Sequence, residues 1–217
     1  MPVADDAPDE GRPPLTRERI LGAALAMADE QGIGGLTMRA LGKTLDVEAM
    51  SIYHHLPSKQ AVIDGIVDLV WAEVTLTPEA EDWRRAVRRT ARSVFVTLLH
   101  HPWANRLRAT SGGPARMTYI NASLAHLRTA GFTPEQAFHA HHVLEAYIQG
   151  YVIQAVDFAP QDPATEAVQR AAALEFLTAA GMTALAEHVE LHGTHLGSSF
   201  DFGLTLLLDG LERRLRA

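Results

Sequence analysis

The chain has 217 residues, 47% hydrophobic and 21% charged, which is enough apolar material for one substantial core or for a small domain joined to a larger one. It contains no cysteine, and this excludes disulfide scaffolds, thiolate zinc sites and cysteine nucleophiles. The formal net charge of -7 argues against non-specific coating of nucleic acid, although net charge is a sum and binding is local.

The first 14 residues differ in composition from the rest of the chain. They combine proline and glycine with four acidic residues against one arginine, and they show no apolar periodicity. We therefore expect a disordered tail over residues 1–14, without the basic and apolar regions of a secretory signal. No window reaches the ~18 uninterrupted apolar residues of a membrane span, so we expect a soluble, cytoplasmic protein without a membrane partner.

Helical periodicity begins after this tail and continues along most of the chain. Thr16 is a plausible N-cap for a helix that runs to about Gln31, and Gly32 stops it. Thr37 opens a second, short helix, and a third follows over about 48–54.

These three short helices with tight connections predict a helix-turn-helix unit over residues 15–60. Ala40 and Gly42 are small enough to let its helices cross closely. The outer face of the third helix is polar or small, as entry into a major groove requires. The apolar inner face is supplied by Leu36, Leu41, Leu45, Val47, Ile52 and Leu56.

The remaining residues, 61–217, are predicted to form a larger helical domain. Breaks fall at proline and glycine clusters, and neither alternating strand patterns nor hairpin signals occur. The prediction is an all-α fold with about nine or ten helices. Beyond the first three, helices are expected near 59–74, 80–100, 102–109, 114–129, 134–157, 164–180, 182–192 and 199–215.

One run of residues in the first sixty positions is far more specific than a general helix-turn-helix pattern. It comprises Gly35-Leu36-Thr37-Met38-Arg39-Ala40-Leu41, Leu45-Asp46-Val47, Ser51-Ile52-Tyr53-His54-His55-Leu56 and Ser58-Lys59. This run resembles the tetracycline-repressor (TetR) family of transcription regulators, and especially its tetracycline-responsive branch. The likeness is strong over residues 15–75, and the segments 130–134 and 200–212 also look like that branch.

The resemblance implies a DNA-binding homodimer and assigns roles to individual side chains. Thr37 would cap the second helix and present its hydroxyl to a phosphate, and Arg39 would reach toward a guanine edge. Lys59 would grip the backbone at the next helix start, where the helix dipole adds positive potential. The other implied DNA contacts come from Glu48, Ala49, Met50, Ser51, Tyr53, His54 and His55.

Some positions depart from the family pattern. Asp46 stands in the turn where glycine is usual, and aspartate tolerates left-handed backbone better than most residues. Ala49 and Met50 differ from the tetracycline repressor's own residues, so the bases read are not implied. The alternative is a short polar helix without DNA, in which Tyr53 packs and Lys59 is a solvated charge.

By the same resemblance, the larger domain binds a small molecule and forms the dimer. The helices expected over 134–157 and 199–215 carry apolar positions with small residues and would pair with their copies as a four-helix bundle. The alternative is that both helices are buried within a monomer. The expected interface residues are Phe138, Gly150, Gly203, Leu204, Leu207, Gly210 and Leu211.

The ligand pocket is expected between the helices of residues 80–157. Its candidate residues mix apolar surface with a few phenols and imidazoles, which suits a mostly hydrophobic ligand that needs one or two hydrogen bonds. For each of them, the alternative is an ordinary core residue without a role in ligand binding. They are Phe95, Leu98, Leu99, Trp103, Leu107, Tyr119, His139, His142, Val143, Tyr147 and Tyr151.

The 11 histidines raise an alternative, a histidine-based metal-binding protein or a metal-sensing regulator. His188 and His192 stand four residues apart, with His195 near, but Glu190 sits one position late for the zincin pattern. Since no further ligand is dictated by spacing, surface or packed histidines are the favoured interpretation, and we expect neither metal nor cofactor. No spaced acid–base–nucleophile arrangement indicates an enzyme.

A basic cluster follows at the start of the 80–100 helix. It is open to two interpretations, a second DNA contact or, as we favour, a solvated face that pairs with the acidic residues just before it. The cluster consists of Arg84, Arg85, Arg88, Arg89 and Arg92.

Taken together, the sequence features predict a repressor that binds a palindromic operator in double-stranded DNA as a homodimer and is released by a small-molecule effector.

Overall fold

A computed structural model describes residues 13–78, 82–107, 113–157, 162–192 and 197–216. Throughout these ranges the regular structure is helical, with α1 to α10 and one short 3-10 helix, so the all-α prediction is confirmed. None of the described helices is both long and apolar enough to cross a lipid bilayer. Almost all of the expected N-terminal tail lies outside the described residues.

The chain divides into two compact units, Met1–Ile66 and Val67–Ala217. The division falls inside α4 (Lys59–Ala72), a little after the boundary expected at residue 60. The last turns of α4 therefore pack with the second unit, while its first turns pack with the first.

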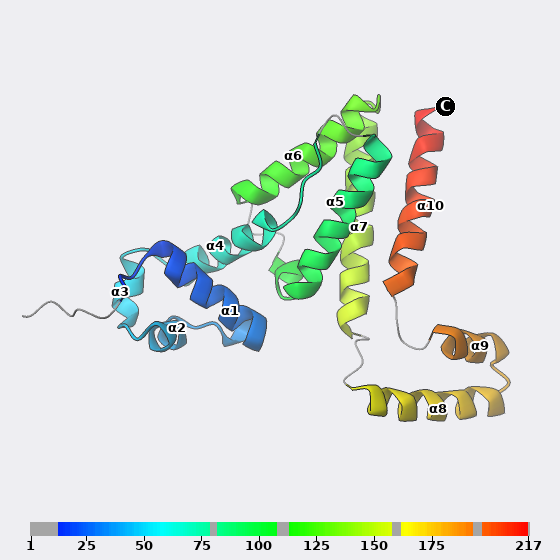
Figure 1. Ribbon diagram of the computed structural model, residues 1–217, viewed down its shortest axis with the longest axis horizontal. Helices are drawn as coiled ribbons and strands as arrows, with labels where there is room; N and C mark the ends of the chain where they lie inside the picture. The colour runs from blue at the N-terminus through cyan, green and yellow to red at the C-terminus, as the bar shows by residue number, and fades with distance from the viewer. Residues whose placement is uncertain (1–12, 79–81, 108–112, 158–161, 193–196, 217) are drawn as a thin grey trace, which may run out of the picture. The chain divides into compact units, whose positions relative to one another are not determined.

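The first unit contains α1 (Arg17–Gly35), α2 (Met38–Leu45), α3 (Ala49–Tyr53) and the start of α4, at the blue end of the chain (Figure 1). Gly32 breaks the regular course of α1 with a φ of 70°, at the position where the sequence predicted a stop, and one further turn continues to Gly35.

Hydroxyl side chains cap three of the four helices in this unit, because each accepts a main-chain N–H that has no partner within its own helix. The caps of α1 and α2 were predicted at Thr16 and Thr37. The capping bonds run from Arg19 N to Thr16 Oγ1 (3.2 Å), from Ala40 N to Thr37 Oγ1 (3.1 Å) and from Ala61 N to Ser58 Oγ (3.0 Å).

Two glycines allow the close packing of this unit. A Cβ on Gly42 would lie 2.8 Å from the main-chain oxygen of Val47, so a side chain there would push α2 away from the turn. A Cβ on Gly65 would lie 2.5 Å from Leu21 Cδ2, in the contact between α4 and α1. The fully buried side chains of the unit include Ile20, Ala24, Ala28, Leu41, Ile52, Leu56 and Val62.

The second unit follows the order expected from the sequence. In Figure 1, α7 and α10 run side by side, and α8 and α9 form a hairpin. Its helices are α5 (Trp83–His100), the 3-10 helix η1 (Ala104–Leu107), α6 (Pro114–Thr129), α7 (Pro134–Asp157), α8 (Pro163–Ala179), α9 (Thr183–His192) and α10 (Gly197–Leu215).

Glu79 and Glu81, two of the acidic residues with which the cluster was expected to pair, lie outside the described residues. Three arginines of α5 join that helix to α10. The partners lie more than a hundred residues away in sequence, so they could not be read from the neighbourhood of the cluster. The hydrogen bonds that Arg84 donates to Asp209 and Glu212 raise the pKa of Arg84. The contacts are Arg84 with Asp209 (2.5 Å) and Glu212, Arg88 with Thr205 (3.1 Å), and Arg92 with Asp201 (2.7 Å).

Candidate functional site

The residues with an implied DNA role lie on α2, on α3 and at the start of α4. Buried Ile52 anchors α3, and its neighbours Ala49 and Ser51 are partly covered. Met50 exposes 68% of its surface and Tyr53 38%, unusually high values for large apolar or aromatic side chains. The other implied contacts are exposed as well, namely Thr37, Arg39, Glu48, His54, His55 and Lys59.

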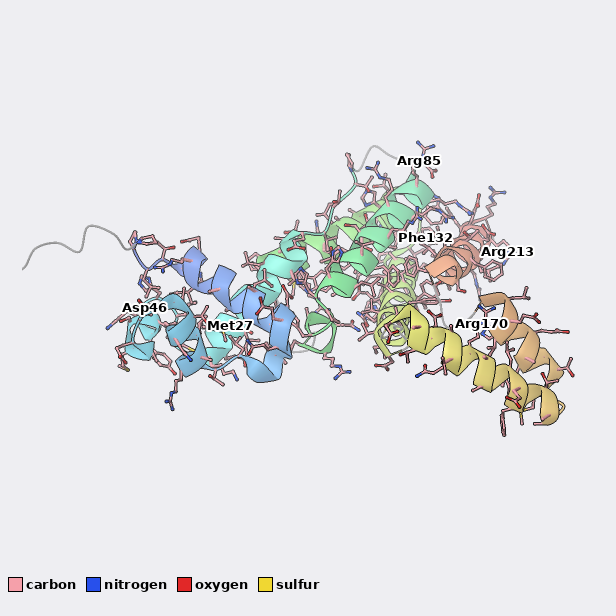
Figure 2. The ribbon with its side chains drawn as sticks, turned by 60° about the horizontal axis from the view of Figure 1, so that its bottom comes forward. Met27, Asp46, Arg85, Phe132, Arg170 and Arg213 are labelled. Carbon is pink, nitrogen blue, oxygen red and sulfur yellow. The ribbon has the colours of Figure 1, made fainter. Side chains whose placement is uncertain are left out.

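The turn between α2 and α3 is set by Asp46, which is labelled in Figure 2. Its backbone is left-handed, with φ 56° and ψ 47°, as its place in the pattern predicted. The N–H of Asp46 donates to the oxygen of Lys43 (3.3 Å), and the N–H of Val47 donates to that of Gly42 (2.9 Å). These bonds satisfy the end of α2 and orient the start of α3.

The chemistry of α2 suits an anionic partner. The helix contains Arg39 and Lys43 and no acidic side chain. The hydroxyl oxygen of Thr37 accepts the N–H of Ala40, so its own proton remains for donation to a phosphate oxygen. The first turn of α2 also carries the positive end of the helix dipole.

The pocket candidates of the second unit fall into separate groups. Phe95 stacks on Phe200 with 4.1 Å between ring centroids, and Tyr147 donates to the main-chain oxygen of Phe200 (2.6 Å). Tyr151 packs edge-on against the same phenylalanine. These three candidates therefore join α5 and α7 to the start of α10. Burial raises the pKa of Tyr147 above its usual value of 10.

Another group of candidates lies on the outer side of α7. His139, His142 and Val143 are exposed, and the rings of both histidines contact Phe138. His139 and Val143 line an open groove of about 600 Å³ between α7 and α10, not an enclosed pocket. Leu98 is buried in α5, and Leu99 beside it is half-buried.

Tyr119 belongs to a buried polar network that the sequence did not reveal. Its hydroxyl donates to Glu145 Oε1 (2.6 Å), and Gln149 Nε2 donates to Glu145 Oε2 (2.9 Å). A guanidinium nitrogen of Arg116 lies 3.9 Å from the same carboxylate. Tyr119, Glu145 and Gln149 are each less than 10% exposed. A buried carboxylate held by three polar partners is unusual in a helical core and marks a possible binding site.

The network extends to a histidine on the same face of α7. His141 lies one turn before Glu145, and its Nδ1 is 3.1 Å from the hydroxyl of Ser123. Burial lowers the pKa of His141, although the Glu145 carboxylate acts in the opposite direction. Burial also raises the pKa of Tyr119 well above its usual value, and Glu145 adds to the effect. The four-residue spacing of His141, Glu145 and Gln149 was the sequence feature that could have indicated a buried polar stripe.

The end of α4 is bound to α6 within the second unit. Trp71 stacks on Tyr119 with 5.1 Å between ring centroids. Asp68 Oδ1 accepts the N–H of Ala115 (2.8 Å), which caps α6 in place of Gly113, a residue without a side chain. A Cβ on Gly113 would lie 2.2 Å from that oxygen, so glycine leaves the space that Asp68 needs.

The remaining pocket candidates, Trp103 and Leu107, lie at η1. Trp103 is 6% exposed, and Leu107 is half-buried. Asn105 between them is buried and donates through Nδ2 to the main-chain oxygen of Gln149 (3.4 Å). This bond connects η1 to the Glu145 network.

The predicted dimer residues divide between the surface and the interior. Phe138 is 53% exposed, and Gly150 is open, with no atom within 4 Å of a Cβ built on it. A Cβ on Gly203 would lie 2.4 Å from the hydroxyl of Tyr147, and Leu204 is fully buried. Gly203 therefore packs closely on Tyr147 and Leu204 is buried within the chain, and the part of either residue in a dimer stays a prediction. Half-buried Leu207, Gly210 and Leu211 line the groove between α7 and α10.

The metal alternative gains no support from the part of the chain that the structure describes. There, no group of three or more histidine, aspartate or glutamate side chains is placed to hold a metal ion. The predicted set on α9 is incomplete, because the side chain of His192 and all of His195 lie outside the described residues.

An N-terminal and a C-terminal part of the sequence each match a known protein family. The family described as "Bacterial regulatory proteins, tetR family" matches residues 20–66, and "Tetracyclin repressor-like, C-terminal domain" matches residues 77–215. The chain belongs to the TetR family of transcriptional regulators. As a TetR-family protein, it is a DNA-binding regulator with a ligand-binding type of C-terminal domain, in agreement with the sequence prediction.

Named relatives and solved structures agree with this TetR-family assignment. An HTH-type transcriptional regulator of Saccharopolyspora erythraea is 33% identical, with 92% of this chain and 86% of the relative covered. The HTH-type transcriptional repressor DrrR1 of Streptomyces coeruleorubidus is 29% identical, with coverages of 93% and 78%. The structure of Streptomyces coelicolor ActR in complex with actinorhodin is similar with a TM-score of 0.76 at 26% identity, and it covers 91% of this chain and 95% of that one.

Proposed function

We propose that this TetR-family regulator is a repressor that binds a palindromic DNA operator as a homodimer and is released by a small, mostly hydrophobic ligand. The observation that carries the proposal is the exposed polar surface of α2 and α3 on a capped, closely packed helix-turn-helix. Its place of action is the cytoplasm, where an operator would be accessible.

On the operator, the side chains of α2 and α3 divide the work between bases and phosphates. Arg39 can present its planar fork to the O6 and N7 atoms of a guanine. Thr37, Tyr53 and Lys59 supply hydrogen bonds to phosphates, which position the unit but do not read sequence. The exposed side chain of Met50 suits an apolar contact with a thymine methyl group.

The homodimer would use the groove between α7 and α10. Phe138, Leu206 and Phe202 are each more than half exposed on these two helices, so a monomer would leave a large apolar surface in water. A two-fold dimer covers this surface with its own copy and places two reading units on half-sites about one DNA turn (~34–36 Å) apart.

The effector would act through the joint between α4 and α6. Asp68 and Trp71 on α4 contact Ala115 and Tyr119 on α6, beside the buried Glu145. A ligand that separates these contacts changes the position of α4, and α4 continues into the first unit. Release then follows from a shift between two states that differ in affinity for ligand and for DNA. ActR, a relative at 26% identity, was solved with actinorhodin, which is consistent with a small-molecule effector.

The test is an electrophoretic mobility shift with DNA from upstream of the protein's own gene. We expect wild-type protein to retard this DNA. Arg39→Ala should weaken binding by about 10- to 100-fold, the equivalent of ~1–3 kcal/mol for a guanine contact. Adding Tyr53→Ala should weaken it further.

The matched control is Arg170→Ala, which removes an exposed arginine from α8 and should leave retardation unchanged. No retarded band with the wild type contradicts the proposal. Equal retardation by wild type and the Arg39→Ala, Tyr53→Ala double variant contradicts the assignment of the reading surface.

A further inference from the structure

The Glu145 network is a polar centre in the interior of the second unit, and the reading of DNA makes no use of it. A chain of contacts leads from Trp71 through Tyr119 to Glu145, and on through Gln149 to Asn105. These side chains come from α4, η1, α6 and α7, so the network lies where four segments converge.

Within the described part of the structure, two buried polar atoms at the ends of this series of contacts have no hydrogen-bond partner. They are the indole nitrogen of Trp71 and the amide oxygen of Asn105, on side chains that are 2% and 7% exposed. The orientation of Asn105 follows from its other bond, because its Nδ2 donates to the oxygen of Gln149. An unpaired buried polar group costs about 1–3 kcal/mol, so a fold rarely keeps two of them close to one network without a use.

We propose that the Glu145 network is the effector-recognition site and that it selects an uncharged ligand with two polar groups. One is an acceptor oxygen for the indole N–H of Trp71, and the other is an O–H or N–H donor for the amide oxygen of Asn105. The inference rests on the proposed function and names the chemical class of its effector.

The selection against charge follows from the composition of the network. Arg116 and Glu145 already place one positive and one negative group 3.9 Å apart. His141, whose pKa is lowered by burial, adds no charge near neutral pH. A ligand with a net charge would have to compete with the Arg116–Glu145 pair for its counter-ion, whereas a neutral donor and acceptor would satisfy both unpaired atoms.

Ligand entry must also displace protein groups. The space beside Tyr119, Ser123 and Leu144 amounts to about 10 Å³, room for one water molecule at most. A ligand that enters beside Tyr119 therefore displaces side chains of the surrounding helices, and Trp71 of α4 stacks on Tyr119. Ligand recognition and the displacement of α4 then involve the same residue, because Trp71 belongs to α4.

Three matched anthraquinones test the selectivity by isothermal titration calorimetry on the full chain without DNA. 2-(Hydroxymethyl)anthraquinone carries acceptor and donor, 2-methylanthraquinone lacks the donor, and anthraquinone-2-carboxylate is an anion. We expect the hydroxymethyl compound to bind about tenfold more tightly than the methyl compound, as one hydrogen bond predicts, and the carboxylate to bind most weakly. Equal affinities, tighter binding of the carboxylate, or no saturable binding of the hydroxymethyl compound overturns the proposal.

Two variants assign the selectivity to residues. Asn105→Leu should remove the preference for the hydroxymethyl compound, while Trp71→Phe should weaken both neutral compounds by the same factor, since both carry the carbonyl. Trp83→Phe is the control and should change neither affinity, because Trp83 packs edge-on against Phe132 outside the network. An unchanged preference in Asn105→Leu overturns the proposal.

A thermal melt of Asn105→Leu separates recognition from a structural role. We expect its midpoint within about 4 °C of wild type, since an unpaired oxygen is removed together with one long hydrogen bond. A larger fall marks Asn105 as a structural residue and overturns its assignment. Failure of the proposed function would appear separately, as absent DNA retardation by the wild type without any probe.

Discussion

The two units of the protein place their polar groups in opposite ways. In the first unit the side chains proposed to contact DNA are mostly exposed, and the caps that hold the helices join residues three positions apart, such as Thr37 and Ala40. In the second unit the distinctive polar groups are buried, and their partners lie far away in sequence, such as Tyr119 with Glu145 and Arg84 with Glu212. Contacts between residues close in sequence can be predicted from the sequence, whereas contacts between distant segments cannot.

The largest expected effect concerns the second unit alone. Phe138→Glu combined with Leu206→Glu places two charges on the exposed apolar sides of α7 and α10. We expect the dimer dissociation constant to rise at least about 100-fold, because like charges would meet their copies in a desolvated interface. Sedimentation velocity measures the assembly, and DNA retardation should fall with it.

The control for this variant is Leu185→Glu, which changes an equally exposed leucine on α9. It should leave the α7–α10 contact intact. A Phe138→Glu, Leu206→Glu protein that remains dimeric would show that the groove between α7 and α10 is not the interface.

A pair of caps gives an effect of intermediate size and compares the two units directly. Thr37→Ala removes a cap three residues away, and Asp68→Ala removes a cap across 47 positions, yet each deprives one main-chain N–H of its acceptor. We expect both to lower the free energy of unfolding by about 1 kcal/mol. Thr37→Ala should also weaken DNA binding in the absence of ligand, because its hydroxyl is proposed to donate to a phosphate.

Urea denaturation measures the change in the free energy of unfolding for both variants. Asp64→Ala serves as the control in α4, since its carboxylate accepts a bond from the exposed side chain of Gln60 and should cost no more than about 0.5 kcal/mol. If Asp68→Ala lowers the free energy of unfolding no more than Asp64→Ala does, the joint between α4 and α6 does not depend on the cap.

The smallest effect, that of Asp46→Gly, is expected at the left-handed turn. Asp46→Gly should change the free energy of unfolding by no more than about 0.5 kcal/mol, because glycine adopts a φ of 56° without strain. Asp46→Val should cost about 1–2 kcal/mol, because a β-branched residue is strained there. A thermal melt of both variants checks the difference, and a Val variant as stable as Gly would contradict it.

The helices and the turn between α2 and α3 could be predicted from the sequence to a considerable extent. Proline and glycine breaks located every helix of the second unit within a few residues, and the spacing around Asp46 indicated both the turn and its left-handed backbone. The proposed effector site was harder to predict from the sequence. Tyr119 was predicted, but Trp71, Asn105 and Glu145 were not, because each becomes significant only through partners on other helices.

The sequence by itself determined the all-α class, the helix-turn-helix and the side chains that it exposes, since caps, turns and apolar periodicity act over a few residues. Tertiary structure decided what lies inside the second unit. It joined α5 to α10 through arginine side chains, buried Leu204 within the chain, and brought Glu145 together with Tyr119 and Gln149. Burial of charge depends on which distant segments meet, and no local pattern encodes that.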